Sequence, residues 1–371
     1  MGKIVRIEIG RLDYPLVGEF KFFRGGVRPT LLARLTDEDG VQGCGQAVPV
    51  ETWSYETAES AASTLELYLA PAVLGADPAD LADVHARMER AIRPSFSVGQ
   101  PLAKAAIDLA CHDLWGRRSG RAACELLGGR AVEQVQLSWT VNAASLEAAE
   151  RQLEAGRAAG YDSFNVKLGA PQTADYDRRL IRAVREFAPS GFHWADANTS
   201  YELDTARAMA RVLADAGFRA LESPLPPNRI RDYQALKAFG ALPILMDEGI
   251  VSPVEAAEFA ALGMYDGIAM KVARCGGLWP ASRIVEGLRE NGLRLFASGL
   301  TDPDLSLAAS LHLFSWAGLD VPAALNGPQY LGMPAERDRI RVPREPGLGL
   351  QPELPPMRIA AEAKPAARRY G

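Results

Sequence analysis

In the second half of the chain, short apolar runs end on a charged or polar residue at nearly constant intervals. The runs read NVK, FHWAD, RALE, ILMD, GIAMK and RLFAS, and helical segments such as ADYDRRLIRAVREFA and LDTARAMARVLADAG lie between them. Their last residues are 29, 26, 25, 24 and 27 positions apart, in the order Lys167, Asp196, Glu222, Asp247, Lys271 and Ser298. Strands that alternate with helices form parallel βαβ units. This many consecutive units favour a closed (β/α) barrel, although an open doubly wound sheet has the same spacing.

The first third of the chain has a different pattern. Residues 3–12 and 29–48 alternate apolar and polar residues as strands do, and the DEDG stretch within the second of them indicates a hairpin. From residue 56 to 127 the spacing is helical, and LAKAAIDLACHDLWGRR, residues 102–118, has the pattern of an amphipathic helix. We therefore predict an α+β unit before the barrel.

Composition and charge exclude several classes of partner. The 371 residues are 48% hydrophobic and 23% charged, and the net charge of −5 gives no footprint for nucleic acid or an anionic membrane. We find no apolar run of about 18 residues, and the first residues alternate like a strand rather than a signal peptide. The four cysteines form no CxxC pair, which predicts neither a zinc site nor disulfides and fits a reduced cytoplasm.

Three of the strand ends carry carboxylates. The carboxyl ends of barrel strands converge on one mouth, so Asp196, Glu222 and Asp247 are expected to meet there. Like charges this close conflict unless a cation lies between them. Carboxylate oxygens with positions left for water and substrate suit Mg²⁺, with Mn²⁺ as an alternative. Helix capping is the commoner role for a lone acidic residue at a strand end.

Lys167 and Lys271 flank the three carboxylates, one strand before them and one strand after them. We expect the two lysines to face each other across the cation, with pKa values lowered by the cation and by burial. Either lysine could then act as a base near neutral pH. This set suits removal of the proton on the carbon next to a carboxylate, because Mg²⁺ stabilises the enediolate that forms.

The motifs at these strand ends resemble those of the enolase superfamily. They are DAN (196–198), ESP (222–224), DE (247–248) and KVARCGG (271–277). The two lysines, the helix AKAAIDLACHDLWGRRSG with the LLGG after it, and LNGPQYL near the end are similar to the muconate lactonising subgroup, which belongs with mandelate racemase.

The resemblance implies a modified TIM barrel of the (β/α)7β type, closed by an α+β capping domain. It implies a capping domain at 1–127, the barrel at 128–326, and a segment at 327–371 that returns to the cap. Capping loops at about residues 18–30 and 48–57 would contact the distal end of a small carboxylate substrate. The family resemblance also suggests a homo-oligomer.

One position departs from the subgroup's pattern. The subgroup usually has Lys-x-Lys on the second barrel strand, and this chain has Asn165-Val166-Lys167. The second lysine is the family's base, so the base is kept at Lys167. The first usually adds positive charge near the substrate carboxylate, and Asn165 offers only a dipole there. Asn165 is therefore either a contact to substrate or a structural hydrogen-bonding residue.

Further residues are candidates for substrate binding or for supporting the metal site. Asn198 is expected to support the metal site, and Glu248 to partner a lysine or to be solvated. The remaining candidates lie at the last two strand ends and in the capping loops: Ser298, Thr301, Asp302, Asn326, Trp53, Tyr55, and Arg24 with Arg28. Asp302 could instead cap the following helix, and surface arginines are usually solvated.

Racemisation or epimerisation is the function that two opposed lysines suit best, since one removes the proton and the other returns it. Dehydration of a hydroxy acid or a hydroxyproline-like substrate, and cycloisomerisation of a muconate-like diacid, use the same groups. A Schiff-base aldolase or lyase would also use a strand-end lysine, but it does not need the three carboxylates. A barrel kept only as a binding scaffold is the non-enzymatic alternative.

Overall fold

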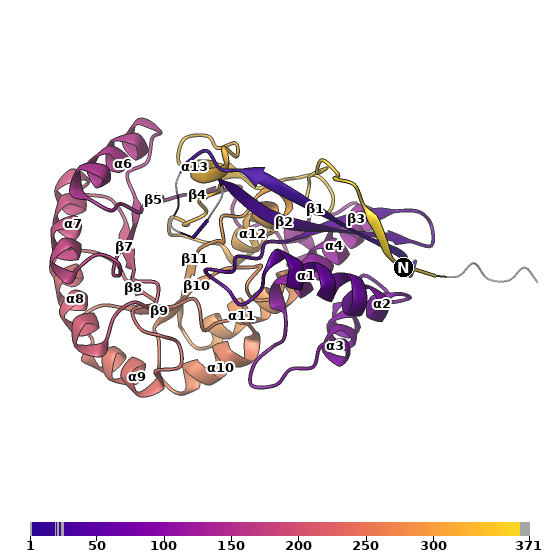
Figure 1. Ribbon diagram of the computed structural model, residues 1–371, viewed down its shortest axis with the longest axis horizontal. Helices are drawn as coiled ribbons and strands as arrows, with labels where there is room; N and C mark the ends of the chain where they lie inside the picture. Colours follow the sequence, from indigo (N-terminus) through magenta and orange to yellow (C-terminus); the bar gives the residue numbers. More distant parts are fainter. Residues whose placement is uncertain (1, 19, 21, 24–25, 364–371) are drawn as a thin grey trace, which may run out of the picture.

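The computed structural model describes residues 2–18, 20, 22–23 and 26–363, and Figure 1 shows a barrel beside a smaller α+β unit. Seven parallel strands form one curled sheet in the order β11-β10-β9-β8-β7-β6-β5. Their bounds are β5 Trp139–Val141, β6 Phe164–Lys167, β7 His193–Asp196, β8 Leu221–Glu222, β9 Ile244–Met246, β10 Gly267–Met270 and β11 Arg294–Ala297. The predicted parallel βα units are confirmed.

A helix follows each of these strands. The helices are α6 Leu146–Ala158, α7 Ala174–Phe187, α8 Leu203–Asp215, α9 Ile230–Phe239, α10 Pro253–Ala261, α11 Leu278–Glu290 and α12 Asp304–Ala317. In Figure 1, α6 to α10 form an outer arc around the strands. Side-chain oxygens of Ser145, Thr173 and Ser252 accept backbone N–H bonds at the starts of α6, α7 and α10. These caps start each helix directly after its loop.

The barrel is closed by two residues rather than by a long eighth strand. Ala324 N donates to Ala297 O, at the end of β11, at 2.8 Å. On the other side, Ser138 N donates to Ala323 O at 2.8 Å, just before β5. Parallel bridges join Ser298 to Ala324 and Leu137 to Ala323. These bonds connect the two edges of the sheet, so the closed barrel is confirmed over the open sheet.

The smaller unit has an antiparallel sheet with helices on it. Its strand order is β13-β1-β2-β3, with β1 Ile4–Pro15, β2 Val27–Asp37, β3 Gln42–Ala47 and β13 Arg358–Glu362. β2 and β3 form the hairpin predicted at DEDG. The helices are α1 Ala58–Thr64, the π-helical turn η1 Leu65–Leu69, α2 Ala70–Val73, α3 Leu81–Ala91, α4 Pro101–Ser119 and α5 Ala123–Leu127.

The C-terminal segment runs back from the barrel to this unit. After α13 (Gly327–Leu331), β12 (Arg339–Arg341) pairs with β4 (Gln134–Gln136). β13 then pairs with β1 at the edge of the antiparallel sheet. The unit therefore contains β1 and β13, the first and last strands of the described residues, and serves as the cap. The division at residues 127 and 326 stays a prediction, since elements on both sides of it pack together.

Helix α4 differs from the amphipathic helix predicted for this segment. It is buried on nearly all sides, including the polar residues Lys104, Asp108, His112 and Asp113. It lies against β3 so closely that a Cβ at Gly45 would come 2.1 Å from Ala106 O. Lys104, Asp108 and Asp113 bond to groups outside the helix, and His112 bonds to Asp108 within it, so these residues do not mark a solvated face. The helix lies between the cap sheet and the barrel and contacts α11.

The four cysteines are free and buried. Burial raises the pKa of Cys44 to about 11 and the pKa of Cys275 to about 12. Because the thiolate is the reactive form, we expect a thiol reagent at pH 8 to label no cysteine in the folded protein and all four in denaturant. A folded protein that consumes reagent at once would contradict this packing. No helix of the described residues has the length and apolarity needed to cross a membrane.

Candidate active site

The five residues predicted from the strand ends lie together at one mouth of the barrel. Lys167 is in register with Asp196, and Asp196 with Glu222, on the neighbouring strands β6, β7 and β8. Asp247 and Lys271 directly follow β9 and β10. All five side chains are buried, and Lys167, at 7%, is the most exposed of them. Buried charges on this scale need partners.

The two lysines contact opposite ends of the row of carboxylates. Lys167 Nζ donates to Asp196 Oδ2 at 2.5 Å. Lys271 Nζ donates to Asp247 Oδ2 and lies 3.7 Å from Glu222 Oε1. Glu222 is held from inside the barrel by Trp194, whose Nε1 donates to Glu222 Oε2 at 2.9 Å. The arrangement places one ammonium group on each side of the row, as the sequence predicts.

The pKa values in this row show an excess of negative charge. Burial, with Asp196 next to it, raises the pKa of Glu222 to about 8. Burial lowers the pKa of Lys167, but Asp196 and Glu222 outweigh it and the pKa lies above its usual value. Without a cation the pKa of Lys167 is therefore raised rather than lowered, because the carboxylates act on the ammonium directly. The lowered pKa beside a bound cation stays a prediction. A cation that offset the carboxylates would reverse that influence.

The row fits a divalent cation by its chemistry. Within the residues the structure describes, no group of three or more His, Cys, Asp or Glu side chains is arranged to hold a metal ion as it stands. The donors are nevertheless all carboxylates from adjacent strand ends. Glu222 Oε1 is buried and accepts no hydrogen bond there, whereas Asp247 Oδ1 forms an ion pair with Arg274 Nε at 3.0 Å. Oxygen donors of this kind suit Mg²⁺.

Asn198 supports the row from the loop after β7. Its backbone N–H donates to Asp196 Oδ1 at 2.8 Å, and its Nδ2 donates to Asp196 Oδ2 at 2.9 Å. The same Nδ2 donates to Glu248 Oε1 at 3.2 Å. Burial and the neighbouring Asp247 raise the pKa of Glu248. Glu248 is therefore a partner of Asn198 and is not a solvated residue.

Trp53 of the cap covers the two lysines. Lys271 Nζ lies 4.9 Å and Lys167 Nζ 5.7 Å from the centre of its ring. Phe22 stacks on Trp53 at 4.1 Å, and Phe20 packs edge-on at 5.8 Å. An aromatic face over an ammonium group is favourable, and the cluster keeps water from the lysines. Tyr55, two residues further along the loop, is 58% exposed, and its contact with a substrate stays a prediction.

Arg274 was not among the residues predicted to form the site, although it belongs to the KVARCGG motif. Its buried guanidinium has Nε 3.0 Å from Asp247 Oδ1, and its Nη1 donates to the carbonyl of Trp53 at 3.2 Å. It therefore connects one carboxylate of the row to the cap. Its position three residues after Lys271, within the KVARCGG motif, is the sequence feature that could have indicated its place in the site.

Asn165 lies inside the barrel on the same side of β6 as Lys167. It is fully buried, and in the described part of the chain neither its Oδ1 nor its Nδ2 has a hydrogen-bond partner. Its neighbour in register is Thr140 of β5, whose Oγ1 is also buried without a partner. Thr140 was not predicted. Polar groups in this state are costly, so the pair is suited to bind a polar group of a substrate.

The candidates from the last two strand ends are also buried at the mouth. Ser298, Thr301, Asp302 and Asn326 are at most 5% exposed. Asp302 accepts from Leu300 N at 3.3 Å and from the Ser306 hydroxyl at 2.9 Å, so it holds the start of α12. Thr301 Oγ1 and Asn326 Oδ1 have no hydrogen-bond partner among the described residues.

Of the two arginines of the first capping loop, Arg24 lies outside the described residues. Arg28 is fully buried rather than solvated. Its guanidinium donates to the carbonyls of Val48, Pro49 and Thr301, and burial lowers its pKa to about 10. Arg28 connects the Trp53 loop to the barrel, and its donors are used by backbone carbonyls rather than by an anionic substrate.

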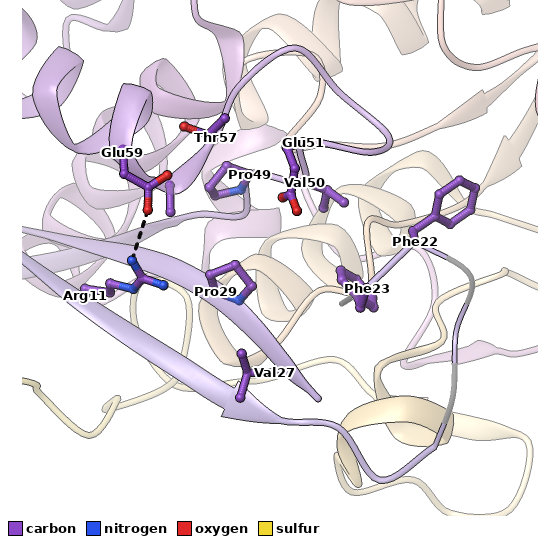
Figure 2. Close-up of a pocket in the computed structure, with 11 residues that line it drawn as sticks. Arg11, Phe22, Phe23, Val27, Pro29, Pro49, Val50, Glu51, Thr57 and Glu59 are labelled. Carbon is purple, nitrogen blue, oxygen red and sulfur yellow. Dashed lines mark hydrogen bonds and ion pairs between the residues drawn. The ribbon is translucent and has the colours of Figure 1, made fainter. Parts of the chain in front are cut away.

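Two cavities adjoin the cap loops. Figure 2 shows one of about 330 Å³ between the β1–β2 hairpin and residues 49–59, where Arg11 bonds to Glu59 at 3.3 Å. None of the five strand-end residues lines it. A groove of about 870 Å³ lies between barrel-loop residues that include Asn142 and Gln172 and cap residues that include Leu16, Phe20 and Phe23. Phe20 lines this groove and also packs on Trp53.

Comparison with known proteins gives the family. The family model described as "Enolase C-terminal domain-like" matches residues 147–355, and the one described as "Mandelate racemase / muconate lactonizing enzyme, N-terminal domain" matches residues 26–128. Muconate cycloisomerase 1 of Rhodococcus opacus is 29% identical over 94% of this chain and 95% of its own length.

N-succinyl-L-Arg/Lys racemase of Bacillus cereus is 26% identical over 94% of this chain and 95% of its own length. The crystal structure of the racemase from that organism superposes with a TM-score of 0.86 at 25% identity, over 96% of this chain and 95% of that one. These relatives are isomerases, and enzymes of the family are generally metal-dependent. The chain therefore belongs to the enolase superfamily, in the subgroup similar to muconate lactonising enzyme.

Proposed function

We propose that this enzyme moves the α-proton of a small carboxylate substrate, with Lys167 and Lys271 as an acid–base pair, and that it racemises or epimerises that carbon. The observation that carries the proposal is the position of the two lysines. They are buried at opposite ends of one row of carboxylates, under a common aromatic cover. A substrate carbon between them would present one face to each ammonium nitrogen.

Asp196, Glu222 and Asp247 would hold Mg²⁺, with Mn²⁺ as an alternative. When bound, the cation neutralises the charge that develops on the substrate carboxylate as the α-proton leaves. Support for this role comes from the donor chemistry of the row and from the buried Glu222 Oε1, which accepts no hydrogen bond in the described residues. Asn198 and Arg274 orient the outer carboxylates, Asp196 and Asp247.

The lysines work in opposite senses. One takes the proton from the face it reaches, and the other gives a proton to the opposite face, which inverts the carbon. Trp53 and the phenylalanines packed on it exclude water, which protects the carbanionic carbon from the solvent. Thr140 and Asn165 are placed to bind an uncharged polar group of the substrate, since their own hydrogen bonds are unmade.

A muconate-type cycloisomerase is the second candidate, because the relative from Rhodococcus opacus carries that name. Dehydration of a hydroxy acid uses the same lysines and stays a third outcome. Schiff-base chemistry is less well supported, since both lysine nitrogens are bound to carboxylates. The four free thiols favour a reducing compartment such as the cytoplasm, and a homo-oligomer remains our expectation from the family.

Product analysis distinguishes these reactions. The enzyme is incubated with Mg²⁺ and single enantiomers of N-succinyl amino acids, dipeptides and hydroxy acids, and with cis,cis-muconate. Chiral chromatography and mass spectrometry then identify the products. We expect the opposite enantiomer or epimer from at least one acid. A lactone from muconate, or loss of 18 mass units from a hydroxy acid, would instead support the second or third reaction.

Asn165→Leu is expected to raise stability and lower activity together. Removing a buried amide without partners should raise the free energy of unfolding by about 1–3 kcal/mol, the usual cost of such a group. Loss of its contact to substrate should lower kcat/KM by about tenfold or more. Urea unfolding and steady-state kinetics measure the two effects. Asn198→Leu is the control, because it removes the two hydrogen bonds that Asn198 Nδ2 donates to Asp196 and Glu248 and should destabilise the protein. Destabilisation by Asn165→Leu would show that its amide is satisfied.

A further inference from the structure

The loop that carries Lys271 is held by the cap. From Lys271 the chain passes through buried residues to Gly277, and α11 begins at Leu278. No side chain of this loop caps the helix, since its N-cap is Gly277. Instead Leu278 N donates to Asp108 Oδ1 at 2.6 Å, and Trp279 N donates to Asp108 Oδ2 at 3.3 Å. A carboxylate of α4, 170 residues away in the chain, therefore caps a barrel helix.

Asp108 packs so closely against this loop that there is no room for a side chain at Gly277. Gly277 has φ +114°, and a Cβ there would lie 2.2 Å from Asp108 Oδ1. Gly276 before it has φ +91°. Both glycines adopt backbone that side chains rarely tolerate, and the second lets the carboxylate approach the helix start. The position of Asp108 thus sets where the loop ends and α11 begins.

Asp108 is itself fixed by two histidines. His85 Nε2 lies 2.8 Å from Asp108 Oδ2, and His112 Nδ1 lies 3.2 Å from Asp108 Oδ1 and 2.9 Å from the Asp108 carbonyl. The ring of His85 also stacks on Trp279 at 4.8 Å. Burial acts to raise the pKa of Asp108, but the histidines outweigh burial and keep it well below its usual range. The carboxylate therefore stays charged at the helix start, where negative charge is favourable.

The same helix also holds the cover of the site. Glu56, in the loop after Trp53, accepts from Leu102 N at 2.7 Å and from Ala103 N at 3.0 Å, at the first turn of α4. Helix α4 is thus bonded at its start to the Trp53 loop and in its middle to the Lys271 loop. Its rigid length fixes the distance between the two.

We infer that Asp108 is a positioning residue for Lys271. Asp108 lies in the cap domain, and its carboxylate accepts the N–H groups at the start of α11 and so fixes residues 271–279. The inference rests on the proposed function for the role of Lys271. Misplacement of a reacting group by about 1 Å can cost roughly 100-fold in rate. Asp108→Asn keeps the size of the side chain but removes its charge and turns one acceptor into a donor.

The test has two readouts, one of which does not depend on catalysis. The first is amide hydrogen exchange of the folded protein, followed in peptides that cover residues 271–279. We expect exchange there to be at least about tenfold faster in Asp108→Asn, as for the loss of about 1.4 kcal/mol of hydrogen bonding. Asp113→Asn is the matched control. Asp113 is a buried carboxylate of the same helix that instead accepts from Cys44 N and Leu348 N, so its loss should leave these peptides unchanged.

The second readout is the exchange of the substrate α-proton in D₂O, measured for each enantiomer. The enantiomer that depends on Lys271 is identified first, as the one whose exchange is lost in Lys271→Ala. For it, Asp108→Asn should lower kcat about 10- to 100-fold with little change in KM. For the other enantiomer, kcat should fall by less than about threefold. Asp113→Asn should affect both enantiomers equally.

If Asp108→Asn lowered kcat for α-proton exchange equally with both enantiomers, or left amide exchange at 271–279 unchanged, the inference would be overturned. If the wild type exchanges no α-proton, the proposed function fails, while the amide exchange still tests the anchoring of the loop. If Asp108→Asn does not fold, His85→Phe takes its place, because it removes one bond to Asp108 and retains a ring against Trp279. It should shift both readouts in the same direction by a smaller factor.

Discussion

Replacing either Lys167 or Lys271 by alanine is expected to lower racemisation at least about 1000-fold. General acid–base catalysis contributes about 10² to 10⁴ in rate, and inversion needs both groups, so one loss should suffice. Each single variant should nevertheless retain α-proton exchange with one enantiomer, the one whose proton faces the remaining lysine. Racemisation by chiral chromatography and exchange by proton NMR measure the two effects separately.

Lys104→Ala is the matched control for these variants. Lys104 is also a buried lysine, but it lies on α4 with its Nζ 3.4 Å from the carbonyl of Ile92, away from the row of carboxylates. Its loss should lower stability without selecting between enantiomers. If both single lysine variants at the mouth still exchanged both enantiomers, the two-lysine account would be refuted.

Glu222→Gln is expected to abolish activity and the stabilisation by Mg²⁺ without destabilising the metal-free protein. Glu222 lies between Asp196 and Asp247 in the row, and burial beside Asp196 already raises its pKa to about 8. Gln removes a charge that is costly in the absence of a cation, while an amide oxygen can still accept from Trp194 Nε1. At a Mg²⁺ concentration 100 times Kd, the free energy of unfolding of the wild type should rise by about 2.7 kcal/mol. That of the variant should rise by almost nothing.

Thermal unfolding with and without Mg²⁺ tests this expectation, with Asp302→Asn as the control. Asp302 is a buried carboxylate of the same mouth that bonds to Ser306 and does not belong to the row. Its variant should keep the full Mg²⁺ effect. A Mg²⁺ shift that survived in Glu222→Gln, or no shift in the wild type, would remove these three carboxylates as the metal site.

The barrel and the five central residues could be predicted because each lies at a strand end and the strands recur at one βα interval. Register then brings Lys167, Asp196 and Glu222 side by side without any long-range information. Closure of the barrel was favoured by the number of units, but the residues that close it could not be predicted in this way. It depends on Ala323 and Ala324, which make only isolated bridges and show no strand pattern of their own.

Residues whose partners are distant in the chain were also beyond sequence reasoning. Asp108 and Asp113 made α4 look amphipathic, but their partners are backbone N–H groups near residues 278 and 348. Arg28 seemed a surface arginine because nothing local indicates the carbonyls that surround it. Trp53 and Tyr55 are neighbours in one loop, and only the folded loop shows that the first faces the lysines and the second faces solvent.

Deuterium incorporation at the α-carbon tests the central claim most directly. Carboxylates from the panel of N-succinyl amino acids and dipeptides are incubated in D₂O with the wild-type enzyme and Mg²⁺, with excess EDTA, or with the Lys167→Ala, Lys271→Ala double variant. We predict deuterium in at least one acid with the wild type and Mg²⁺, and none in the other two samples. Incorporation by the double variant, or no incorporation by the wild type into any acid, would contradict the account.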